Sequence, residues 1–239
     1  MKALSALSII LFVICVSTLL ITTNLRLAVN EDRLYEYGFN KFDVGAKTGL
    51  DDTELHDFAN QMIAYFNSGD VLFEPDPVTF TDRELEHLKD VKGLIKLAYY
   101  LQYASLTYVC LYVIGNFVVR RGAFWRDLAK RLFWGGGTTV ALLAFFGLWA
   151  TTDFDSLFLL FHLVGFRNDL WQLNPADNML QMFPQGFFNE AALFVAAATI
   201  LEAVIIGGSA WGIPRLRRNL RTDTAEVGSN KGDNERDGS

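Results

Sequence analysis

The chain has 239 residues, of which 51% are hydrophobic and 20% are charged, and its formal net charge is −6 at pH 7. This composition is that of a membrane protein. The distribution of charge leaves no footprint of a nucleic-acid-binding surface, so we expect no nucleic-acid partner.

Four apolar runs are long enough to cross a hydrocarbon core of about 30 Å, which takes about 20 helical residues. They cover residues 3–23, 97–119, 132–151 and 191–214. The first run lacks a small-x-small cleavage site, so we interpret it as an uncleaved anchor. The sequence therefore predicts an all-α membrane protein with four transmembrane helices, in one domain of residues 1–221.

The positions of the basic residues predict the orientation of these helices. The segment VVRRGAFWRDLAKR at 118–131 joins the second and third runs, and PRLRRNLR follows the fourth. Lys and Arg in short loops resist translocation, so both segments are expected in the cytoplasm. Residues 24–92 hold fifteen acidic residues against seven basic ones, which suits the outer side. Both termini of this cell-membrane protein are then cytoplasmic, and its working surface is extracytoplasmic.

Residues 24–92 are predicted to form an extracytoplasmic helical cap. One helix should begin near Asp51 or Asp52. Its apolar residues are spaced for one face: Leu55, Phe58, Ala59, Met62 and Phe66. His56 lies off this face, and we interpret it as a solvated surface residue. The cap has few apolar residues for an independent core, so it should lean on the membrane spans.

A second cap helix begins with a capping box, because Glu84 follows Thr81 by three residues. No helix breaker precedes Gly93, so this helix can run into the second span. His87 then stands roughly 9 Å above the entry to that span, at headgroup depth. Glu84 and Asp90 lie about one turn away on either side and could orient the imidazole or hold it protonated. A charged, solvated helix face is the plainer interpretation of this stretch alone.

The outer loop of residues 152–190 begins with about a dozen mainly apolar residues, too few to cross, so this segment should be re-entrant or interfacial. His162 lies in it, with Phe158 and Phe166 on the same helical face, and desolvation should favour the neutral imidazole. A neutral imidazole can accept a proton near pH 7. An aromatic anchor with an incidental histidine is the alternative. Asp169 or a carboxylate of the cap could supply the hydrogen-bond partner of the ring.

Three stretches of the sequence resemble one known family. They are YGF at 37–39, FTDRELEHLKDV at 80–91 and FHLVGFRNDLWQLNPADNMLQMFPQGFF at 161–188. Together with the four-span layout, these stretches resemble the bacterial lipoprotein intramolecular transacylases and their uncharacterised integral-membrane relatives. The resemblance extends over nearly the whole chain, up to about Arg221.

The resemblance implies an enzyme that moves an acyl chain from the glycerol of a diacylglyceryl-cysteine lipoprotein to the free α-amine of the same cysteine. It implies His87 and His162 as the catalytic pair. It also implies four residues that form or support the site: Asn168, Asp169, Trp171 and Asp177. The neighbours of the two histidines add Asp90, Phe161 and Phe166 as supporting residues. The expected partners are diacylglyceryl-modified lipoproteins and membrane lipids, with no soluble cofactor, and the protein is expected to be a monomer.

The residues themselves are compatible with ester aminolysis. A free α-amine has a pKa of about 8, so a neutral imidazole can take its proton as attack proceeds. A second, protonated histidine or the Asn168 amide could serve the oxyanion and the leaving oxygen. No G-x-S-x-G elbow occurs in the sequence, which disfavours a covalent acyl-enzyme.

Two other functions stay open on the sequence alone. One is a non-catalytic module that binds lipids or lipoproteins, and the less favoured one is a metal-dependent membrane hydrolase. No H-E-x-x-H or comparably compact ligand set occurs, so no metal site is predicted.

Three further features carry structural predictions. Glu202, in the fourth span, is expected to be neutral and hydrogen-bonded to a Thr or Ser of another span. The glycines at 135–137 and 207–208 are expected at close helix contacts. Residues 222–239 are rich in Gly, Asn, Asp and Glu and are expected to form a disordered cytoplasmic tail.

Overall fold

The computed structural model describes the backbone of residues 2–69, 73–120 and 124–236, and the side chains of residues 6–69, 73–119 and 124–212. All regular structure in these ranges is helical, which confirms the predicted fold class. The helices are α1 (Lys2–Asn30), α2 (Asp32–Lys41), α3 (Val44–Thr48), α4 (Asp52–Asn67), α5 (Asp82–Arg120), α6 (Phe124–Thr152), α7 (Phe154–Gly165), α8 (Asn178–Met182) and α9 (Gln185–Arg236).

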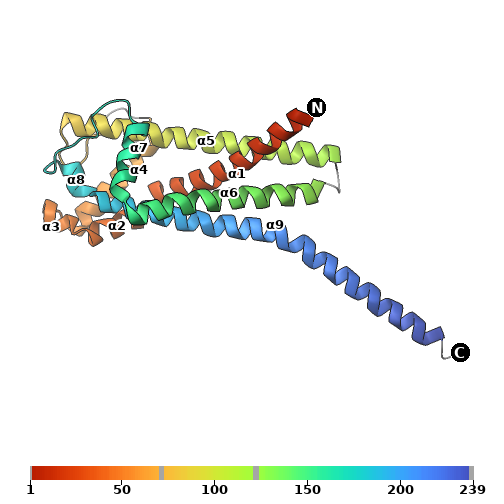
Figure 1. Ribbon diagram of the computed structural model, residues 1–239. Helices are drawn as coiled ribbons and strands as arrows, with labels where there is room; N and C mark the ends of the chain where they lie inside the picture. Colours follow the sequence, from red (N-terminus) through yellow and green to blue (C-terminus); the bar gives the residue numbers. More distant parts are fainter. Residues whose placement is uncertain (1, 70–72, 121–123, 237–239) are drawn as a thin grey trace.

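Four long helices, α1, α5, α6 and α9, run side by side as an elongated bundle (Figure 1). Each is long and apolar enough to cross a membrane, so the chain is a multi-pass membrane protein with the four predicted spans. Large apolar side chains such as Leu111, Val119 and Leu148 are exposed on the outside of the bundle. Such exposure is unfavourable in water and is satisfied by the hydrocarbon of a bilayer.

Small residues bring α6 and α9 into close contact. A Cβ atom placed on Gly136 would lie 2.7 Å from the carbonyl oxygen of Ala203 and 3.4 Å from the Cα of Gly207. Only glycine allows the two backbones to approach this closely. The predicted close packing is confirmed for Gly135, Gly136 and Gly207, whereas at Gly137 and Gly208 a Cβ would meet nothing within 4 Å.

Glu202, in the membrane-crossing part of α9, accepts a hydrogen bond of 2.7 Å from the Asn24 side chain of α1. The Asn24 amide also donates to the Leu20 carbonyl, at 3.1 Å. A Thr or Ser hydroxyl was predicted as the partner of Glu202, and this prediction was wrong, because the donor is an amide. Asn24 occupies the level at which α1 meets α9, and its amide satisfies the carboxyl group.

α5 has 39 residues, nearly twice what a membrane crossing needs. Its first part, residues 82–96, is rich in charged residues and lies beside the cap, so the crossing part begins near Leu97. The predicted capping box is present. The Thr81 backbone N–H donates to Glu84 Oε2 at 2.7 Å, and the Glu84 N–H donates to Thr81 Oγ1 at 3.3 Å. His87 therefore lies on α5 outside the membrane-crossing segment.

The cap consists of α2, α3 and α4 at one end of the bundle, with α8 beside them (Figure 1). α4 begins at the Asp51 cap, and its buried face contains the predicted residues and also Tyr65. Its residues form part of one buried cluster, the cap core: Tyr35, Phe39, Val44, Leu55, Phe58, Ala59, Met62, Tyr65, Phe66, Phe73, Val78, Phe80, Leu88, Ile95, Met179, Met182, Phe183 and Phe187. Several members belong to α5, α8 and α9, so the cap leans on the long helices as predicted.

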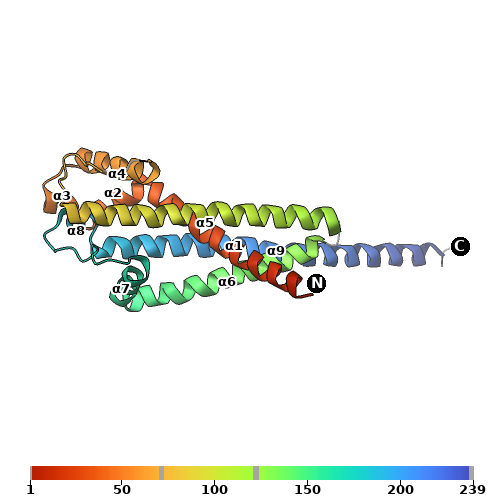
Figure 2. The same ribbon diagram turned by 90° about the horizontal axis from the view of Figure 1, so that it is seen from above.

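α7 lies across the bundle axis at the cap end, as Figures 1 and 2 show together. The chain breaks after α6 at Asp153, whose carboxylate accepts a hydrogen bond of 3.1 Å from the Ser156 N–H and so starts the new helix. The outward-facing residues Leu163 and Val164 are 62% and 78% exposed. A short, crosswise helix with an exposed apolar face fits the predicted interfacial segment.

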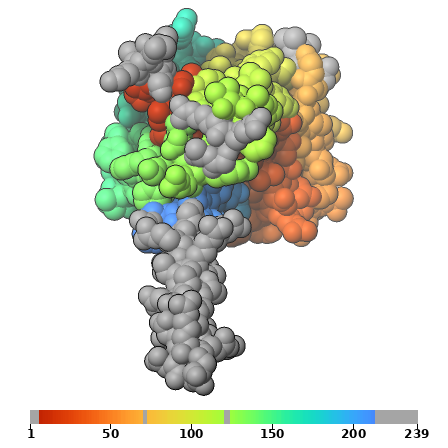
Figure 3. All heavy atoms as spheres, turned by 90° about the vertical axis from the view of Figure 1, so that its right-hand side faces the viewer, coloured from red at the N-terminus to blue at the C-terminus, as the bar shows by residue number. Residues whose placement is uncertain are grey.

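The start of α1 and the end of α9 lie at the end of the bundle away from the cap (Figure 1). Viewed along the bundle from that end, α2–α4 project on one side, opposite α6 (Figure 3). α9 continues as a helix to Arg236, which differs from the disorder predicted for residues 222–236, and residues 237–239 of the predicted tail lie outside the described residues. Helices gain most of their stability from packing an apolar face, which this polar segment does not offer. Disorder of the tail therefore stays a prediction.

Candidate active site

Two histidines from different helices meet beside the cap. The ring centroids of His87, on α5, and His162, on α7, are 6.1 Å apart, with an angle of 30° between the rings. Each residue is only 6% exposed. Two buried imidazoles that face each other form an unusual polar island in an aromatic environment, and this pair defines the candidate site.

Helical spacing puts three polar residues of α5 on the side of the helix that faces this site. Arg83, His87 and Asp90 are spaced at i, i+4 and i+7, so one face of α5 carries all three. This face of α5 meets the connection between α7 and α8. The segment of that connection from Phe166 to Trp171, the 166–171 loop, lies against α5.

The hydrogen bonding of His162 fixes its tautomer. Its Nδ1 lies 2.7 Å from the carbonyl oxygen of Phe158, one turn earlier in α7. A carbonyl oxygen only accepts, so Nδ1 carries the proton and Nε2 presents a lone pair. The backbone is therefore the partner of the ring, and the expected carboxylate partner, Asp169 or one from the cap, was wrong.

Burial governs the protonation of both rings. The pKa of His162 is lowered by desolvation, although the hydrogen bond to Phe158 partly opposes the shift. The pKa of His87 is lowered to about 4, first by desolvation and then by the nearby His162, with Asp90 opposing. His87 Nδ1 is buried and has no hydrogen-bond partner among the described residues. Both imidazoles are therefore neutral near pH 7, and a protonated His87 held by acidic neighbours was a wrong expectation.

Glu84 does not contact the His87 ring as an orienting group, because its carboxylate is used elsewhere. It is 1% exposed. Its Oε2 accepts from the Thr81 backbone and hydroxyl at 2.7 and 2.8 Å, and its Oε1 accepts from the Met179 N–H at 2.7 Å. Glu84 thus joins the start of α5 to α8 one turn above His87. The sequence indicated the capping box, but the contact with Met179 had no signal in the spacing.

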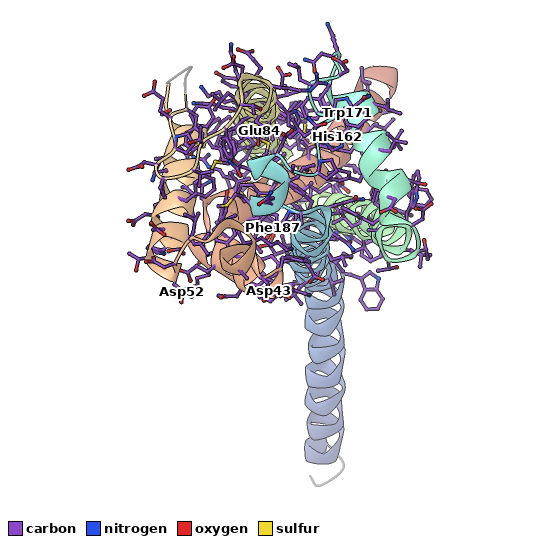
Figure 4. All side chains as sticks on the ribbon, turned by 90° about the vertical axis from the view of Figure 1, so that its left-hand side faces the viewer. Asp43, Asp52, Glu84, His162, Trp171 and Phe187 are labelled. Atoms are coloured by element: carbon purple, nitrogen blue, oxygen red, sulfur yellow. The ribbon has the colours of Figure 1, made fainter. Side chains whose placement is uncertain are left out.

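Aromatic rings enclose the two histidines. The Phe166 ring lies 5.0 Å from that of His87 and 5.4 Å from that of His162. Trp171 lies 5.0 Å from His162, and the two labelled side chains are close together beside α5 in Figure 4. The exposed Phe161 lies 5.3 Å from His162 on the outward side. This enclosure is the physical cause of the desolvation that lowers both pKa values.

Two polar contacts attach the 166–171 loop to α5 on either side of His87. The Asn168 amide donates to Asp90 Oδ2 at 2.8 Å. The Arg83 guanidinium donates to the backbone carbonyl of Asp169, and its Nη2 lies 3.8 Å from the Asp169 carboxylate. Sequence reasoning missed Arg83, although its i−4 spacing from His87 was a usable signal.

Asp177 forms its side-chain hydrogen bond within its own turn and not with the paired rings. Its Oδ2 accepts a hydrogen bond of 2.8 Å from the Asn174 N–H and closes the turn before α8. The other predicted supporting residues contact a histidine ring or the α5 face that carries His87. The structure thus gives Asp177 a role in its own turn.

The chemistry that these side chains offer is proton transfer. His162 presents an unprotonated Nε2, and neutral His87 can present one N–H as a donor. Among the residues whose side chains are described, no group of three His, Cys, Asp or Glu side chains is placed to hold a metal ion. The Asp90 carboxylate, about one turn after His87 on α5, is engaged by Asn168.

Comparison with solved structures identifies the same architecture elsewhere. The fold matches the in meso structure of the membrane integral lipoprotein intramolecular transacylase Lit from Bacillus cereus, with a TM-score of 0.77, 18% identity, and coverage of 93% of this chain and 100% of that one. Two structures of the same protein with one histidine replaced, by arginine or by alanine, each match with a TM-score of 0.75 and 17% identity. They cover 92% and 91% of this chain, and 96% of each matched chain. At these identities the likeness shows the fold.

Sequence comparison adds a relative and a family. An uncharacterised protein of Aquifex aeolicus (strain VF5) is 29% identical over 127 residues, which is 53% of this chain and 54% of that protein. The match thus spans about half the length of that curated relative. The family model described as "Lipoprotein intramolecular transacylase Lit" matches residues 10–188, a range that contains both histidines and the 166–171 loop. The chain therefore belongs to the lipoprotein intramolecular transacylase family, Lit.

Proposed function

We propose that this protein is an intramolecular transacylase. It moves an acyl chain from the diacylglyceryl group of a lipoprotein to the α-amine of the N-terminal cysteine and leaves a lyso-form lipoprotein. One observation carries the proposal. The His162 imidazole, with its Nδ1 held by a backbone carbonyl and its Nε2 free, faces a second neutral imidazole at 6.1 Å.

In this mechanism His162 is the general base. Its Nε2 takes a proton from the α-amine as the amine nitrogen attacks the ester carbonyl carbon. The carbonyl of Phe158 supports this step, because it holds the Nδ1 proton and stabilises the imidazolium that forms. Since amine and ester belong to the same cysteine, binding supplies a high effective concentration.

His87 is assigned to the oxyanion. A neutral imidazole that donates one N–H can stabilise the negative oxygen of the tetrahedral intermediate inside a desolvated site. Collapse of the intermediate breaks the bond between the carbonyl carbon and the glycerol oxygen. That oxygen leaves with the proton that His162 Nε2 had taken, so an amide and a free glycerol hydroxyl result, and His162 is neutral again. No cofactor and no acyl-enzyme are required.

The position of the site supports a lipid substrate. His162 is buried on α7, while Phe161, Leu163 and Val164 of the same helix are exposed. An ester at the glycerol level of a leaflet would therefore meet the helix that carries the base. We assign the site to the extracytoplasmic side of the cell membrane and both termini to the cytoplasm. The partners are diacylglyceryl-modified lipoproteins and bilayer lipids, and the enzyme acts as a monomer.

The test uses the purified full chain and a purified diacylglyceryl lipoprotein with a free α-amine. His162→Ala and His87→Ala should each abolish the N-acylated lyso product, as measured by mass spectrometry of the lipoprotein's N-terminal peptide. His56→Ala is the matched control, because this histidine pairs with Glu36 in the cap at 2.7 Å and is half-exposed. Unchanged product in either site variant would overturn the assignment.

A second measurement separates catalysis from passive binding. If both variants still bind the lipoprotein but form no product, a purely lipid-binding role is excluded. Intact-mass analysis of the enzyme during turnover should show no acyl adduct. An adduct that releases product would contradict direct aminolysis.

A further inference from the structure

We propose that Arg83 is a positioning residue, which holds the 166–171 loop so that Trp171 stays against His162. This inference rests on the proposed function for its consequence in catalysis, although its structural part does not. Arg83 contacts neither histidine ring. It acts through the backbone of the loop.

The first step of the argument is the contact itself. The Arg83 guanidinium donates to the backbone carbonyl of Asp169, two residues before Trp171. The ion pair with the Asp169 carboxylate is longer, at 3.8 Å, and its side chains are 40% and 76% exposed. Exposed ion pairs contribute little, whereas a charge-assisted hydrogen bond to a carbonyl fixes a position. Arg83 therefore acts mainly through the backbone of the loop, and its ion pair with the Asp169 side chain adds little.

The second step is the arrangement of two anchors around His87. Arg83 lies one turn before His87, and Asp90 lies about one turn after it on the same face of α5. Asp90 holds Asn168 at 2.8 Å, and Arg83 holds the next residue of the loop. A segment held at two adjacent residues from opposite sides of His87 has one preferred placement over the site.

The third step is what the anchored loop presents to the site. Phe166 contacts both imidazoles, and Trp171 contacts His162 at 5.0 Å. With the Asp169 anchor released, Asn168 would be the remaining polar anchor of the loop on α5, and Trp171, beyond both anchors, would be free to move away from His162. Water would then reach the base, and the substrate ester would lose one wall of its binding site. Small misplacements of bound groups are costly to reaction rate.

The test follows Trp171 directly by fluorescence. A variant in which Trp125, Trp134, Trp149 and Trp211 are replaced by Phe leaves Trp171 as the single emitter. In this background Arg83→Ala should shift the emission to longer wavelength and increase quenching by acrylamide. It should also weaken the quenching of Trp171 that accompanies protonation of His162 at low pH, because contact between the two rings is lost.

Three companion variants sharpen the result. Arg83→Lys keeps one donor for the Asp169 carbonyl without the planar fork, so it should restore much of the native emission. Asp169→Asn keeps the backbone acceptor, so its emission should stay close to the native spectrum. Arg33→Ala is the control, because Arg33 forms an exposed ion pair with Glu31 at 3.7 Å in the cap. Native emission in Arg83→Ala would overturn the proposal.

Activity is measured in parallel, in the wild-type tryptophan background. Arg83→Ala should lower kcat for lipoprotein transacylation by about tenfold or more, with a smaller change in KM, because the loop positions reacting groups. Arg83→Lys should recover most of this loss. An inactive wild-type protein would sink the proposed function, while the fluorescence result would still decide the role of Arg83. An active Arg83→Ala variant with native kcat would sink the positioning role alone.

Discussion

The imidazoles of His87 and His162 face each other at 6.1 Å, although one belongs to the extended start of α5 and the other to the short crosswise helix α7. Neither helix contains a site by itself. The pair exists because the turn after α6 directs α7 across the bundle. The protonation state of the two rings and the chemistry that we assign to them both depend on this crossing and on the phenylalanines around it.

The pH dependence of the reaction should report the buried state of the pair. Because the pKa values of both histidines are lowered, protonation of the pair should reduce kcat/KM only below the ordinary histidine value of about 6.5. Phe166→Ala should let water reach both rings, raise both pKa values and move this acid limb to higher pH. The measurement is kcat/KM against pH with the purified lipoprotein substrate.

The substrate provides an internal reference for that experiment. The attacking α-amine must be unprotonated and has a pKa of about 8, so kcat/KM should already fall below about pH 8 and fall more steeply once the histidines are protonated. The limb near pH 8 should stay in place in the variant. An acid limb that does not move in Phe166→Ala would contradict desolvation by this ring as the cause of the shifts.

Glu84→Gln should destabilise the protein by about 1–3 kcal/mol. The buried carboxylate accepts from both the Thr81 and Met179 backbones, and an amide nitrogen in place of one oxygen would face a donor. Thermal unfolding in detergent measures the loss. Glu54→Gln is the matched control, since Glu54 occupies the same position in the solvent-exposed capping box of α4, where it accepts from Asp51 N–H at 2.9 Å. Equal effects of the two substitutions would refute the importance of burial.

Gly136→Val should lower the thermal midpoint strongly, because added carbons would meet the Ala203 carbonyl and force α6 and α9 apart. Overpacking of this kind costs about 1–3 kcal/mol. Gly137→Val serves as the control, because a Cβ there meets nothing within 4 Å. The contact would be unimportant for stability if both variants melted together.

Glu202→Gln should retain activity and folding. The Gln carbonyl oxygen can still accept from the Asn24 amide, which lies 2.7 Å from the native carboxyl. Asn24→Leu, by contrast, leaves the acid without this donor in an apolar environment and should reduce the yield of folded protein. Loss of transacylation in a well-folded Glu202→Gln protein would show that the ionisable group has a chemical role that our mechanism omits.

The sequence predicted the features that depend on local pattern. The four apolar runs, the Thr81–Glu84 capping box and the buried face of α4 all follow from spacing along a helix, and all are confirmed. The neutral state of His162 also followed from its phenylalanine neighbours. The catalytic assignment of the pair came from the family resemblance and stays a prediction.

Features that depend on how distant segments cross were predicted less well. Glu202 needed a hydrogen-bond donor, but only the crossing of α1 and α9 selects Asn24. The contact of Glu84 with Met179 and that of Arg83 with the Asp169 backbone likewise join residues far apart in the chain. A backbone acceptor leaves no trace in residue type, which is why the partners of His162 and Arg83 were both missed.

The cap core has a practical consequence for work on this protein. Phe58 of α4 packs against Phe183, which lies between α8 and α9, and Phe187 of α9 packs edge-on against Phe183. A water-soluble fragment limited to residues 32–92 would leave those aromatic surfaces bare and would tend to aggregate. Antibodies or inhibitors aimed at the cap end should therefore be raised against the intact chain in lipid or detergent.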